Sequence, residues 1–64
     1  MTILDEISDR IARGYRAELL FNFETGENVV TTWLDNPIDI DHKQYVLSKD
    51  SYSVAELRKI VYGI

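Results

Sequence analysis

Apolar residues in the first part of the chain recur every four positions, the spacing of a helix with one buried stripe. The stripe consists of Ile3, Ile7 and Ile11. Thr2 and Asp5 have the spacing of a capping box, and Gly14 is placed to end a helix in a left-handed conformation. The pattern therefore predicts a helix over residues 3–13.

The next segment alternates apolar and polar residues with a period of two, which indicates a strand over residues 15–23. A β-branched run indicates a second strand over residues 28–34, and a third is expected over residues 44–48. We interpret residues 38–41 as a long loop or a short edge piece. The odd positions of the first strand are expected to face the core: Tyr15, Ala17, Leu19, Phe21 and Phe23.

The turn between the first two strands decides which face of the second strand is buried. A three-residue loop over 24–26 places Gly26 at the left-handed position, whereas a two-residue loop puts the β-branched Thr25 at positive φ. We favour the three-residue loop, in which Leu20 faces Val30 on the outer face and Trp33 belongs to the core. A slip by one residue exchanges the faces and exposes Trp33 as a candidate binding anchor.

The end of the chain predicts a second helix. Ser53 and Glu56 again have the spacing of a capping box, an apolar face follows, and Gly63 stands at the end. The order of elements predicts one α+β domain over residues 1–64, a three-stranded antiparallel meander with an N-terminal and a C-terminal helix (α-β-β-β-α). Because each helix has one apolar stripe, we expect both helices on one face of the sheet and solvent on the other.

The composition narrows the chemistry. The chain has 64 residues, no cysteine and a single histidine, His42. Disulfides are therefore impossible, and a structural zinc site, which needs four Cys or His ligands, is disfavoured. The group formed by Asp35, Asp39, Asp41 and His42 does not match the spacing of an EF-hand calcium loop. We predict neither a metal nor a cofactor.

Catalysis is disfavoured as well. The chain has no cysteine nucleophile and no glycine-rich phosphate loop. A chain of this size buries only about 60% of its surface. A pocket of roughly 300 Å³ or more is therefore hard to build. We expect a protein that is not an enzyme.

The charges are segregated along the chain. Residues 17–42 carry six carboxylates and no Lys or Arg, while the whole chain has a formal net charge of −4. This balance argues against direct binding to nucleic acid or to an acidic membrane, and favours a protein partner with a basic surface. The alternative is that these acids only keep the chain soluble.

An outer-face strip at Leu20 and Val30 suggests a partner surface or a homodimer contact through the open sheet face or an edge strand. Alternatively, a helix covers it, or the exposed apolar residues have no role. The candidate partner-binding residues are Glu18, Leu20, Glu24, Glu27, Val30, Asp35, Asp39 and Asp41.

The order of elements resembles that of small phage-encoded inhibitors of the anti-CRISPR type, which act on Cas nucleases. The resemblance lies in a first helix ending Ala12-Arg13-Gly14-Tyr15, an acidic three-stranded meander and a closing helix. It implies an acidic inhibitor that occupies a nucleic-acid-binding surface of its target, with contacts from Glu24, Glu27, Asp35, Asp39 and Asp41. The first residues lack the basic region of a signal peptide, so we expect the protein in the cytoplasm of a bacterial host.

Overall fold

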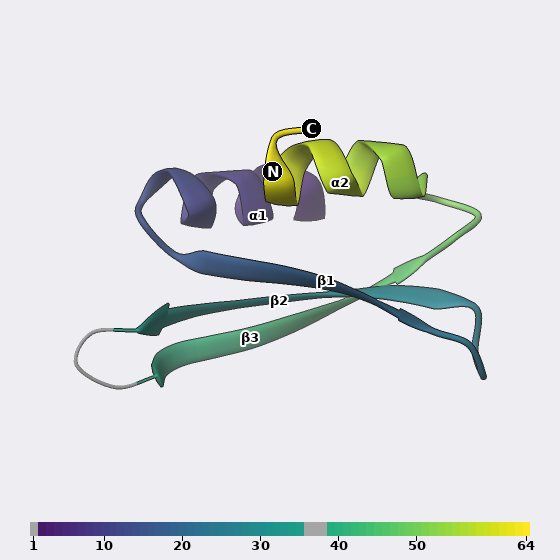
Figure 1. The fold of residues 1–64 in the computed structure, drawn as a ribbon, viewed down its shortest axis with the longest axis horizontal. Coiled ribbons are helices and arrows are strands. Elements are labelled where there is room, and N and C mark those ends of the chain that lie inside the picture. The colour runs from purple at the N-terminus through teal and green to yellow at the C-terminus, as the bar shows by residue number, and fades with distance from the viewer. Residues whose placement is uncertain (1, 36–38) are drawn as a thin grey trace.

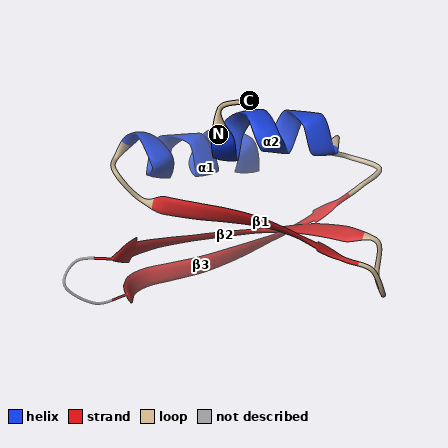
Figure 2. Ribbon diagram, viewed as in Figure 1, coloured by secondary structure: helices blue, strands red, loops and turns tan. Residues whose placement is uncertain are grey.

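Two helices lie side by side on one face of a three-stranded sheet in the computed structural model, which describes residues 2–35 and 39–64 (Figure 1). The opposite face carries no helix, as the colouring by secondary structure makes plain (Figure 2). The predicted α+β order is therefore confirmed. The elements are α1 (Ile3–Ala12), β1 (Arg16–Asn22), β2 (Glu27–Asp35), β3 (Asp39–Ser48) and α2 (Val54–Tyr62).

Both helices begin where the sequence predicts. Thr2 Oγ1 accepts the backbone N–H of Asp5 at 3.1 Å, and Asp5 Oδ2 accepts the N–H of Thr2 at 3.3 Å, which completes a capping box at α1. At α2, Ser53 Oγ accepts the N–H of Glu56 at 3.1 Å. Each bond satisfies a backbone donor at the helix start that has no partner within the helix.

The sheet has the order β1-β2-β3, and both pairs are antiparallel. Strand β3 begins at residue 39, well before the predicted start at residue 44, so residues 39–43 extend the strand and include residues 39–41 of the segment interpreted as a loop or edge piece. Residue 38, the first of the segment interpreted as a loop or edge piece, lies outside the described residues. A β-bulge follows, because Thr32 pairs with Lys43 but Leu34 pairs with Ile40. Asp41 in this bulge has a positive φ of 53°.

The predicted register between β1 and β2 is wrong by one residue. Leu19 lies opposite Val30, and the last pair is Asn22 with Glu27, so the loop spans residues 23–26. Asn22 Oδ1 accepts the N–H of Glu24 at 3.0 Å, and Asn22 O accepts the N–H of Gly26 at 2.8 Å. These bonds close a four-residue turn in which Gly26 keeps the predicted left-handed conformation, with a φ of 74°.

The shift exchanges the faces of β2. Val30, expected on the outer face, is fully buried at 0% exposure, and Trp33, expected in the core, lies half-buried on the helix-free face. The expectation for Phe23 is also wrong, since Phe23 lies in the turn and is 89% exposed. The slip places Val30 beneath the helices, where its burial removes apolar surface from water.

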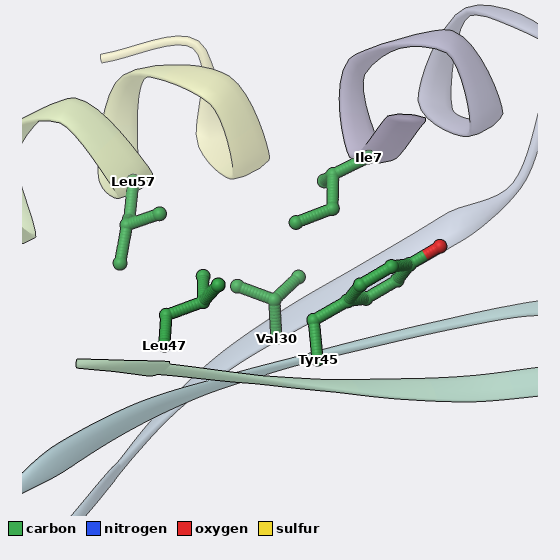
Figure 3. Packing of buried hydrophobic residues seen from close by; sticks show 5 residues of the cluster. All are labelled: Ile7, Val30, Tyr45, Leu47 and Leu57. Carbon is green, nitrogen blue, oxygen red and sulfur yellow. The ribbon is translucent and has the colours of Figure 1, made fainter. Parts of the chain in front are cut away.

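The hydrophobic core lies between the sheet and the two helices. Val30, Tyr45 and Leu47 rise from the sheet toward Ile7 of α1 and Leu57 of α2 (Figure 3). Leu4, Ile11, Leu19, Tyr52, Ile60 and Val61 pack around this cluster. Because the helices cover only one side of the sheet, the core leaves the other side open to contact.

Candidate interaction surfaces

The helix-free face of the sheet presents an apolar row across all three strands. Val29 in the centre pairs with Leu20 on β1 and with Val46 on β3. The two outer members are exposed, Leu20 at 51% and Val46 at 57%. Sequence reasoning placed Leu20 correctly but paired it with Val30. It did not name Val46, although the alternation of residues 44–48 puts this residue on the same face.

A second feature of this face is an aromatic stack beside the bulge. The rings of Trp33 and His42 lie nearly parallel, with centroids 6.2 Å apart and an angle of 26° between the planes. The bulge sets two β3 residues, Asp41 and His42, against the single residue Trp33. It thereby turns His42 toward the open face and Asp41 toward α1.

The open face carries an acidic excess. By strand alternation, Glu18 and Glu27 share the face of Leu20 and Val29. Arg16, the first residue of β1, forms an ion pair with Asp35, with 3.6 Å between the guanidinium and carboxylate atoms. This pair has no net charge. Among the described side chains, Glu18 and Glu27 therefore give the helix-free face its excess of negative charge.

The remaining acidic candidates do not form one patch. Glu24 is exposed in the turn at one end of the sheet, and Asp35 lies at the other end. The side chain of Asp39 lies outside the described residues. The structure thus divides the acids of residues 17–42 between two ends, separated by roughly 25 Å along β2.

Asp41 connects the sheet to α1. Its carboxylate lies 3.2 Å from Arg10 Nη2, its backbone oxygen accepts from the same nitrogen at 2.5 Å, and its carboxylate also accepts a short hydrogen bond from the Tyr15 hydroxyl. The bond from Tyr15, followed by the nearby Arg10, lowers the pKa of Asp41 despite partial desolvation. The same bond raises the pKa of Tyr15. Asp41 is therefore committed to an internal contact.

A second ion pair joins the same two elements. Lys43 Nζ on β3 lies 2.8 Å from Glu6 Oε1 on α1. This hydrogen bond lowers the pKa of Glu6 and raises the pKa of Lys43. Two charges from the α1 side and two from β3 thus compensate each other on the helix-covered face.

A groove of about 380 Å³ lies between α2 and the end of β1, larger than sequence reasoning expected for so short a chain. Val54, Arg58 and Tyr62, spaced four residues apart on one ridge of α2, form one wall. The other residues that line it are Leu19, Leu20, Phe21 and Asn28. The four-residue spacing of the α2 ridge was visible in the sequence, but which part of the sheet it would face was not.

Comparison of this chain with protein-family models, with curated proteins and with solved structures finds no match. Within residues 2–35 and 39–64, neither helix is long and apolar enough to cross a membrane. In the same part of the chain, no three His, Asp or Glu residues gather in a way that would hold a metal ion.

Proposed function

We propose that this chain is a non-catalytic protein-binding module that uses the helix-free face of its sheet to cover a basic, nucleic-acid-binding surface of a partner protein. The apolar row of Leu20, Val29 and Val46, left uncovered by both helices, is the observation that carries the proposal. Burial of exposed apolar side chains is the main source of affinity in protein complexes.

The charge of the open face supports a basic partner. Glu18 and Glu27 flank the apolar row, while Lys43 is turned to the opposite face by its pairing with Glu6. Carboxylates around an apolar centre steer a basic surface toward this face and suppress acidic partners. An inhibitor encoded by a phage or mobile element, acting on a host protein such as a Cas effector, is the setting we propose.

The test begins with the tagged chain as bait in a bacterial lysate and continues with each recovered protein in purified form. We expect the recovered protein to lose binding to DNA when the chain is added. Replacing both Leu20 and Val46 with Ser should weaken the complex by about tenfold or more. The matched control is Ile3→Ser, a half-exposed apolar residue on α1 that should leave the affinity unchanged.

Charge is tested separately from apolar contact. Glu18→Gln should lower the association rate and flatten its salt dependence, whereas Glu56→Gln on α2 should change neither. A partner that binds DNA and this chain at the same time would contradict the proposed block. A partner that binds the Leu20 and Val46 variant as tightly as the original would contradict the proposed face.

Self-association is the second candidate, because the same apolar row can pair with a copy of itself. In that case the chain sediments as a dimer and Leu20→Glu yields monomers. A chain that stays monomeric at high concentration excludes this candidate.

A further inference from the structure

The groove between α2 and β1 combines apolar walls with polar groups that have no partner in the described part of the chain. The Asn28 side chain is buried, at 2% exposure, and its Nδ2 has no hydrogen-bond partner there. A buried amide donor without an acceptor costs free energy, so the lining of the groove holds a hydrogen-bonding capacity that the described residues leave unused.

A positively charged side chain also lines the groove. Arg58 lines the groove and forms no ion pair within residues 2–35 and 39–64, in contrast to Arg10, Arg13 and Arg16. A guanidinium only donates hydrogen bonds and prefers a carboxylate as its partner. The groove therefore offers donors and a positive charge next to apolar carbon.

The backbone of β1 adds a third feature. The N–H of Leu19 donates to the Tyr62 hydroxyl at 3.1 Å, so this group points away from β2. Ladder bonds alternate along an antiparallel strand, so the backbone groups of Phe21 also point away from β2. Strand β1 is an edge of the sheet, and the Tyr62 hydroxyl accepts the backbone N–H of that edge at Leu19.

Exposed aromatic surface continues from the groove to the tip of the hairpin. The Phe21 and Phe23 rings meet edge to face with centroids 5.0 Å apart, and both side chains are exposed. Such contiguous aromatic surface is typical of a site that another molecule covers.

We propose that this groove binds an extended segment of a partner protein that carries an apolar side chain and, two residues away, a carboxylate. The segment adds to the edge of β1 through the backbone of Phe21, as in other cases of strand addition. Side chains two residues apart in a strand share one face, so the apolar group fills the groove while the carboxylate meets Arg58. The segment lies over Asn28, which lines the groove.

This inference concerns a different surface from the helix-free face and does not rest on the function proposed for that face. The two surfaces have only Leu20 in common. The groove attracts an acidic segment, whereas the open face attracts a basic one. A failure of one proposal therefore leaves the other unaffected.

The test titrates the ¹⁵N-labelled chain with the peptide acetyl-Thr-Leu-Thr-Asp-Thr-amide. We expect saturable shifts at millimolar peptide in the backbone amides of Leu19 and Phe21 and in the side-chain amide of Asn28, with Thr31 on the open face unchanged. Replacing the peptide's Asp with Asn should weaken binding by about threefold to tenfold.

Substitutions in the chain test whether Arg58 contacts the carboxylate of the peptide. Arg58→Gln should weaken binding of the Asp peptide by the same factor and leave binding of the Asn peptide unchanged. The matched control, Lys59→Gln, changes a neighbouring exposed cation that does not line the groove and should alter neither affinity. Unchanged circular dichroism shows that each variant folds.

Three results would overturn the proposal. Shifts absent from the groove, or confined to the open face, would exclude the site. Equal binding of the Asp and Asn peptides would exclude the carboxylate contact. A dimer in sedimentation that the peptide disperses would identify a second copy of the chain as the occupant in place of a partner segment.

Discussion

On the helix-free face of the sheet, Leu20 of β1 lies directly opposite Val29 of β2. This pairing places Val30 on the other face, where it packs between Ile7 and Leu57 beneath the helices (Figure 3). One register therefore determines both the core and the surface that the chain offers to partners.

Two valines on opposite faces provide a matched test of the register. Val30→Ala should lower the free energy of unfolding by about 2 kcal/mol, because it leaves a cavity in the core. Val46→Ala, on the exposed row, should change it by less than about 0.5 kcal/mol. Urea denaturation of both variants gives the two values. Similar losses for the two valines would contradict the register.

Asp41 is expected to act through its backbone as well as its charge. Its positive φ suits Asp and Asn better than Ala, which lacks a side chain that bonds locally. Asp41→Asn should therefore unfold at a lower urea concentration than the original, and Asp41→Ala at a lower one still. If the two variants have the same midpoint, the left-handed conformation contributes nothing.

The ion pairs of Glu6 and Asp41 predict a loss of stability in acid. The pKa of each carboxyl is lowered in the folded state from its ordinary value, 4.5 for Glu6 and 3.8 for Asp41. The unfolded chain then binds more protons as the pH falls through these values, so the free energy of unfolding decreases. The stabilisation is fully present above the unfolded pKa values and is lost as the pH falls through the folded ones.

The contribution of Glu6 to this pH dependence is separable. Replacing Lys43 with Gln removes the hydrogen bond that lowers the pKa of Glu6 and should reduce the slope of stability against pH below about pH 4.5. Glu6→Gln removes the titrating group itself, with the effects of Tyr45 and Arg10 as well, so the double variant should reduce the slope no further than Glu6→Gln alone. Additive reductions would show that the two residues act independently.

Gly26 closes the β1–β2 hairpin in a left-handed conformation. Gly26→Ala should cost about 1 kcal/mol through the backbone, because the atoms nearest to an added Cβ belong to the Lys49 side chain, at an ordinary 3.7 Å. Gly26→Asn should cost less, since Asn tolerates positive φ. Thermal unfolding of both variants measures the difference, and a loss that is larger for Asn would contradict this explanation.

The candidate surfaces could be predicted from the sequence only in part. The period-two alternation of β1 correctly placed Glu18 and Leu20 on the outer face. The acidic character of residues 17–42 was also visible, but the engagement of Asp41 by Arg10 was not, because thirty-one residues separate them along the chain. The groove was missed for the same reason, since it forms where α2 meets β1.

The sequence by itself determined the two helices, their caps, the order of the strands and the left-handed glycine of the turn. These features depend on residues within about four positions of one another, and local hydrogen bonds and backbone preferences suffice to establish them. Only the tertiary structure decided the register of β2, the burial of Val30 and the placement of Trp33. Turn chemistry alone favoured loops of two or three residues, whereas the observed loop has four, and the resulting register buries Val30 beneath both helices.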